Sequence, residues 1–192
     1  MKLPAAEHTS RSWRIHDIAP GFQVEDVWAL ATPGGPDDFP RLVRTFLSDD
    51  PAGDPLLFRM LFAVRWRIGK IFGFDDPGSG ISALAPTLRD RLPSDLRDLP
   101  PGPEFPTVPF TSLYLTENEW AAEVANRTVH AVMHMGWVPE EGDRYRGQMT
   151  VLVKPNGLLG KSYMAAIAPF RSFVIFPSML RGTERRWQTC AE

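Results

Sequence analysis

Five stretches of the chain have the pattern of strands, and in the first of them apolar and polar residues alternate with a period of two, which is typical of a strand that buries one face. One stretch lies near the start, at residues 13–18, and is closed by Pro20-Gly21. The other four follow residue 110, at residues 111–116, 119–125, 128–138 and 145–154. We predict a strand for each. Residues 119–125 and 128–138 are predicted to form a hairpin with its turn at Asn126-Arg127.

Helical periodicity is clearest in the first half. Asp54 and Pro55 suit a helix start, and apolar residues then recur at steps of three and four up to Gly73. This predicts a helix over residues 54–72. Shorter helices are predicted at residues 25–30, 37–47 and about 81–91. From Gly157 onward the chain is predicted to be helical and apolar, with Pro169 and Pro177 as kinks or breaks.

One segment supports two interpretations. Thr116-Glu117-Asn118-Glu119 matches a helix-capping box, so residues 120–125 suit a helix as well as a strand. Propensity does not decide between the two.

These elements predict a single domain over residues 1–192 of the α+β class. A helical insertion covers about residues 22–92, and a proline-rich crossing loop covers about 93–109. A strand-rich region and the C-terminal helix fill residues 110–190. The expected architecture is a curved antiparallel sheet packed on a long, proline-kinked C-terminal helix, with additional helices in the N-terminal half.

Composition narrows the class of protein. The 192 residues are 43% hydrophobic and include 12 Phe, 6 Trp and 7 Met, which is ample material for a core. The net charge of −2 gives no global basic field for nucleic acid, so no nucleic-acid partner is expected. Cys190 is the single cysteine, which excludes an intramolecular disulfide. With no signal-like start and no run of about 18 apolar residues, we expect a cytoplasmic protein without a transmembrane segment.

Two motifs suggest chemistry that their surroundings do not support. Residues 155–162 end in Gly-Lys-Ser like a phosphate-binding loop, but Pro155 stands where that loop needs its first glycine. We interpret the segment as the turn that starts the last helix, and we expect no nucleotide cofactor. His130 and His134 have the spacing of a helical zinc pair, but on a strand they lie about 13 Å apart, and we predict no metal site.

The C-terminal half resembles the family catalogued as domain of unknown function 2867 (DUF2867). The resemblance rests on the strand at residues 149–153 and on a set of residues at fixed spacing: Asn156, Gly160, Tyr163, Pro169 and Phe170. It covers about residues 110–182. The family pattern commonly has a histidine where this chain has Arg171, and a charged turn where this chain has residues 126–128, so no role is carried over to those positions.

The resemblance implies a relationship to the helix-grip superfamily, which includes START and Bet v1-like proteins and is also called SRPBCC. There, a curved sheet wraps a long helix around an apolar cavity. The function expected here is therefore binding of a small apolar or amphipathic molecule. Candidate ligand-binding residues are the apolar Trp28, Met133, Trp137 and Phe173 and the polar His134, Tyr163 and Arg171.

Two alternatives stay open. The same cavity would serve an enzyme if His134 or Tyr163 acted as general acid or base. Alternatively, the basic face of residues 55–72 would make the protein a non-enzymatic module that docks on a protein or on an anionic membrane surface. Ligand identity, oligomeric state and pathway are not predicted.

Overall fold

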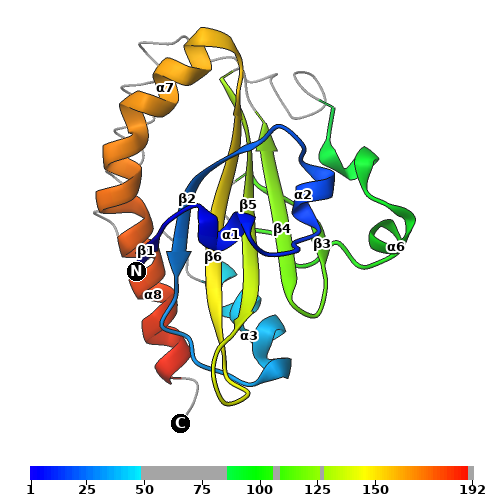
Figure 1. Cartoon of the computed structure of the whole chain (residues 1–192), viewed down its shortest axis with the longest axis vertical. Coiled ribbons are helices and arrows are strands. Elements are labelled where there is room, and N and C mark those ends of the chain that lie inside the picture. Colours follow the sequence, from blue (N-terminus) through cyan, green and yellow to red (C-terminus); the bar gives the residue numbers. More distant parts are fainter. Residues whose placement is uncertain (49–85, 106–108, 126–127, 190–192) are drawn as a thin grey trace.

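The computed structural model describes residues 1–48, 86–105, 109–125 and 128–189. Its centre is a curved, six-stranded antiparallel sheet with the order β1-β2-β6-β5-β4-β3 (Figure 1). All four strands predicted after residue 110 are confirmed. The bounds of the six strands are β1 (Lys2–Leu3), β2 (Gln23–Ala29), β3 (Thr111–Leu115), β4 (Glu119–Ala125), β5 (Val129–Pro139) and β6 (Tyr145–Pro155).

Two predictions for the first thirty residues are wrong. The segment at residues 13–18 is a loop followed by the one-turn helix α2 (Ile15–Ile18), because Ile15 and Ile18, three residues apart, are both buried on one helical face. Residues 25–30 were predicted to be helical, but residues 25–29 belong to β2 and Leu30 follows the strand. A β-bulge between Val24 and Asp26 interrupts the period-two alternation there, so the strand pattern is hidden in the sequence.

The helix predicted at residues 37–47 is confirmed as η1 (Pro36–Asp38) and α3 (Phe39–Leu47). The described part of the helix expected at 81–91 is a short 3₁₀ turn, η3 (Leu88–Arg91), and α6 (Ser94–Arg97) follows within the proline-rich crossing. A further one-turn helix, α1 (Ala6–Thr9), precedes α2. The predicted helix at 54–72 and the predicted turn at Asn126-Arg127 lie outside the described residues.

Residues 119–125 form a strand and not a helix. The Thr116 hydroxyl does accept a hydrogen bond from the Glu119 backbone N–H, as a capping box requires, but it closes the β3–β4 turn. The Glu119 side chain contacts His134 of the neighbouring strand β5 instead of reaching back to the turn. β4 also pairs along its whole length with β5.

The C-terminal helix is continuous from Gly157 to Thr189 and runs beside β1 and β2 along the length of the sheet (Figure 1). It consists of α7 (Gly157–Phe170), the π-helical segment η4 (Arg171–Ile175) and α8 (Phe176–Thr189). Pro169 and Pro177 flank the π segment and do not end the helix. Proline lacks a backbone N–H, and the wider π turns accommodate the backbone hydrogen bonds that are missing at these positions.

This helix is also long and apolar enough to cross a membrane by length and composition, with 22% of the relevant window buried. Length and composition alone do not separate a spanning helix from a core helix. The charged side chain of Arg171 lies buried at its middle, facing the sheet.

Each face of the sheet carries its own core. The first, which we call the helix face, packs against α3, α7 and α8 through Trp120, Met135, Trp137 and Met149. The second, which we call the histidine face, is covered by α1, α2 and residues 88–96 and includes Val132 and Leu152. The two faces alternate along β4, β5 and β6, so neighbouring residues of β5 belong to different cores.

Candidate functional site

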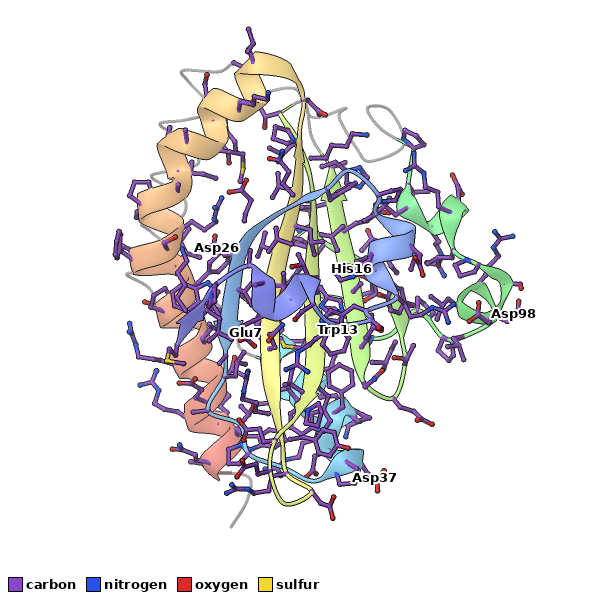
Figure 2. All side chains as sticks on the ribbon, in the orientation of Figure 1. Glu7, Trp13, His16, Asp26, Asp37 and Asp98 are labelled. Atoms are coloured by element: carbon purple, nitrogen blue, oxygen red, sulfur yellow. The ribbon has the colours of Figure 1, made fainter. Side chains whose placement is uncertain are left out.

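All four histidines of the chain gather on the histidine face. His8 comes from α1, His16 from α2, and His130 and His134 from β5. Figure 2 shows α1 and α2 lying across this face, with His16 on α2 and Trp13 on the loop between the two helices. His8 and His134 are completely buried, whereas His16 is partly exposed at the edge of the cluster.

Three of the imidazoles form a continuous hydrogen-bonded chain. His16 Nε2 lies 3.2 Å from His8 Nδ1, and His8 Nε2 lies 3.3 Å from His134 Nδ1. His134 Nε2 in turn lies 3.2 Å from the Glu119 carboxylate. Because a carboxylate only accepts, neutral His134 must donate from Nε2 and accept at Nδ1. Because Nδ1 of His134 accepts, His8 must donate to it from Nε2 and accept at its own Nδ1. For the same reason His16 donates from Nε2 to Nδ1 of His8.

The inner end of this chain is a fully satisfied carboxylate. Glu119 accepts hydrogen bonds from the Arg14 backbone N–H at 2.9 and 3.0 Å, from the Tyr114 hydroxyl at 3.1 Å and from His134. Burial alone would raise the pKa of Glu119, but these hydrogen bonds and the electrostatic interaction with His134 outweigh it and the pKa is lowered. Glu119 is therefore ionised inside the protein. Burial, reinforced by Glu119, raises the pKa of Tyr114 well above 10.

The middle of the chain is held neutral. Burial, followed by the neighbouring imidazoles of His134 and His16, lowers the pKa of His8 from 6.5 to about 2. Burial and His134 also lower the pKa of His16, against the opposite effect of Glu119 and Asp17. Chemically, the chain can pass a proton from the partly exposed His16 inward to the Glu119 carboxylate without a water molecule.

A second pair repeats the inner end of this arrangement. His130 Nε2 lies 2.7 Å from the Glu123 carboxylate. That carboxylate also accepts hydrogen bonds from the Thr87 hydroxyl and, at 3.1 Å, from the Leu88 backbone N–H. Burial would raise the pKa of Glu123, but the hydrogen bonds from His130 and Thr87 lower it. The second pair therefore also holds a buried, ionised carboxylate.

These two pairs were not predicted from the sequence, although a signal was present. Glu119 and Glu123 are four residues apart on β4, and His130 and His134 are four apart on β5. In an antiparallel hairpin this spacing places both acids and both imidazoles on one face, each acid diagonal to one imidazole. The H-x-x-x-H spacing therefore marks two separate ion pairs, and among the described residues no group of three or more His, Cys, Asp or Glu could hold a metal.

The seven predicted ligand-binding residues fall into three places. Trp28, Met133 and Trp137 share the helix face, and Tyr163 of α7 packs against the same core. His134 lies on the opposite face with both ring nitrogens in hydrogen bonds. Phe173 is 80% exposed, so the structure does not bring it together with the others. His134 and Tyr163, the two candidate acid–base residues, thus lie on different sides of the sheet, and the basic stretch 55–72 lies outside the described residues.

Arg171 is the charged group on the helix face. Its Nε lies 2.6 Å from the buried Asp26 carboxylate and its Nη2 lies 3.1 Å from Glu25. Lys2 approaches Asp26 from outside at 2.7 Å. The third guanidinium nitrogen, Nη1, lies 3.8 Å from the sulfur of Met164. This ion pair ties the π segment of the helix to the bulge of β2.

The middle of the helix face keeps a small exposed surface. Small fractions of surface, between 7% and 9%, remain exposed on Trp28, Ala131, Met133, Val151 and Met164, which we call the middle patch. On the same face, Met135, Met149 and Trp120 are 0% exposed, and on the other face so are Val132 and His134. The Trp28 indole N–H is buried without a hydrogen-bond partner among the described residues.

The motif residues that carried the family resemblance lie at the start of the long helix and before its π segment. Asn156 directly follows β6, and its backbone N–H donates a hydrogen bond to the Thr128 carbonyl. The next residue, Gly157, has a φ of +64°. A Cβ on Gly160 would overlap the Thr128 carbonyl oxygen, so only glycine fits this contact. Pro169 and Phe170 close α7. The segment is the helix-starting turn that the sequence predicted.

A sequence model of one protein family matches residues 18–179; the family is described as "Protein of unknown function (DUF2867)". The match covers most of the chain and includes β2, β4, β5, β6 and α7, whereas His8, Trp13 and His16 precede it. No curated protein and no solved structure matches.

Proposed function

The chain belongs to the DUF2867 family, whose description names no activity, and we propose from its geometry that it binds a small apolar or amphipathic molecule. The proposed site is the space between α7, which contributes Met164, and the strand residues of the middle patch, Trp28, Ala131, Met133 and Val151. This is the position that a helix-grip (SRPBCC) relationship implies for a ligand cavity. The observation that carries the proposal is the residual exposure of the middle patch on strands that lie inside the sheet.

The chemistry of the patch supports an apolar ligand with one polar end. Its described lining consists of an indole, a small alanine, a valine and two methionines, and thioethers adapt readily to different apolar shapes. Two donors lie at its border: the indole N–H of Trp28 and Nη1 of Arg171, which faces Met164. Both suit a carbonyl, hydroxyl or carboxylate on the ligand.

The proposal can be tested by filling the proposed site with a larger side chain. In the Ala131→Leu variant, the leucine side chain should occupy the space at the middle patch. We expect it to weaken binding of the fluorescent probe N-phenyl-1-naphthylamine at least about tenfold while changing the free energy of unfolding by less than about 1 kcal/mol. Native mass spectrometry of the freshly purified wild-type protein should also show a bound species that denaturation releases.

Ala122→Leu is the matched control, because Ala122 lies on the same face and is 0% exposed. Without space for the extra atoms, it should lose about 1–3 kcal/mol of stability. The proposal fails if the wild-type protein does not bind the probe. It also fails if Ala131→Leu is as destabilising as Ala122→Leu, since no space would then exist at the patch.

A further inference from the structure

A hollow of about 380 Å³ opens on the other side of the sheet, away from the middle patch. It lies between the α1–α2 loop and the ends of β4 and β5, beside the labelled Trp13 in Figure 2. The loop contributes Ser10, Arg11, Ser12 and Trp13, the β3–β4 turn contributes Asn118, and the end of β5 contributes Trp137 and Pro139. Hollows of this size hold small organic molecules.

The charge of the hollow has one sign. Arg11 is the charged residue among the side chains that line it, and no acid is among them. Arg11 takes part in none of the ion pairs formed by the described residues. The nearest loop cation, Arg14, is instead paired with Asp95 at 2.6 Å. An unpaired guanidinium beside hydroxyl and amide groups favours an anion with oxygen acceptors.

Two buried donors in the hollow's lining lack acceptors. The Nε–H of Arg11 and the indole N–H of Trp13 are both shielded from solvent, and neither finds a hydrogen-bond partner within the described part of the chain. Trp13 is only 6% exposed. Buried donors in proteins are almost always paired, so two of them in one hollow indicate that an acceptor is supplied from outside.

We propose that this hollow binds a small oxyanion, a carboxylate or a phosphate, through Arg11 and the indole N–H of Trp13. The site is separate from the proposed apolar site, because the sheet lies between them. Trp13 also joins the hollow to the histidine chain: its ring lies 5.2 Å from that of His134 and rests against Gly136. An anion at Arg11 therefore contacts the side chain that covers the buried imidazoles.

The experiment follows the indole N–H signals of the ¹⁵N-labelled full chain by NMR. Inorganic phosphate, acetate and benzoate are titrated separately at constant ionic strength with chloride as the balancing anion. The Trp13 signal is identified by its loss in Trp13→Phe. We expect a saturable downfield shift of this signal with at least one probe, and comparison of the three probes separates phosphate from carboxylate recognition.

Arg11→Gln should weaken this binding about tenfold or more, since it removes the charge-assisted donor. Arg14→Gln is the matched control: it removes the same charge from the same loop but does not line the hollow, and it should leave the dissociation constant within about twofold. The proposal is overturned if no probe shifts the Trp13 signal. It is equally overturned if Arg11→Gln and Arg14→Gln weaken binding to the same extent, because the effect would then be general electrostatics.

Discussion

His134 of β5 donates to Glu119 of β4 from the diagonal position across the hairpin, and His130 stands in the same relation to Glu123 one repeat further along. Each carboxylate also accepts one hydroxyl and one backbone N–H. Glu119 takes these from Tyr114 and Arg14, and Glu123 takes them from Thr87 and Leu88. The two pairs thus fasten two separate crossing segments to the sheet.

The buried histidine chain predicts a loss of stability in acid. His8 has a pKa of about 2 when folded and about 6.5 when unfolded, so the unfolded chain binds more protons below pH 6.5. The contribution is complete above pH 6.5 and declines as the pH falls towards 2. Between pH 7 and pH 5 we expect a loss of about 2 kcal/mol, measured by urea unfolding. The lowered pKa of Glu119 adds a loss of the same sign below about pH 4.5.

The variant His8→Gln removes this titration and should flatten the slope between pH 7 and pH 5. Its absolute stability at pH 7 should be lower, because His134 Nδ1 and His16 lose their shared partner. An unchanged slope in the variant would contradict the assignment of the acid sensitivity to His8.

The two carboxylates should contribute to stability separately. Glu119→Gln and Glu123→Gln each present an amide donor to groups that are themselves donors, and each should cost about 1–3 kcal/mol in urea unfolding. Because the two sites are about 13 Å apart on one strand, the double variant should show the sum of the two losses. Glu117→Gln, on the exposed β3–β4 turn, is the control and should change stability by less than about 0.5 kcal/mol. Strong non-additivity would show that the pairs are one unit.

The ion pair between Arg171 and Asp26 predicts a large single-site effect. Arg171→Met leaves the fully buried Asp26 without its closest partner, and we expect a loss of about 3–5 kcal/mol in chemical unfolding. Adding Asp26→Asn should recover part of it, since this removes a buried carboxylate charge that, among the described residues, would otherwise be paired only with the partly exposed Lys2. Arg181→Met, exposed on the same helix, should be nearly neutral. A neutral Arg171→Met would show that water reaches Asp26.

Gly160 predicts a steric effect of one methyl group. Gly160→Ala places a Cβ on the Thr128 carbonyl oxygen, which forces the start of α7 away from the start of β5. The expected cost is about 1–3 kcal/mol, measured as a lower thermal midpoint and as amide shifts at residues 128–130. At Gly35 a Cβ would meet its nearest atom at 3.7 Å, so Gly35→Ala should be tolerated.

Local patterns in the sequence predicted most of the sheet but not its first long strand. The four later strands were predicted close to their observed bounds, although both faces of β4, β5 and β6 are mostly buried and the pairing of β3 shifts between Ser112 and Tyr114. In β2 the bulge shifts the pairing, and its polar residue Asp26 is buried only because Arg171 reaches it from the far helix. No window of local sequence contains that partner. The histidine chain could not be predicted from local sequence for the same reason, because His8 and His134 are distant in the sequence and meet only in the folded protein.

The positions of some candidate ligand residues could also be predicted from local sequence, and those of others could not. Met133 and Trp28 were predicted from residue type, and their shared face follows from strand register once β2 is a strand. The exposure of Phe173 did not follow, because the side of the long helix that meets the sheet depends on its contacts there, which include the buried Arg171, Phe176 and Leu180.

The strand order also constrains how the chain is made. β2 lies between β1 and β6, with Val24 opposite Leu152, so the two paired strands are separated by most of the intervening chain. During translation β3, β4 and β5 are all made before β6, and β2 therefore pairs with β6 only after these three strands have been synthesised. The β2–β6 pairing is thus a long-range contact that closes a long loop, which makes it slow to form.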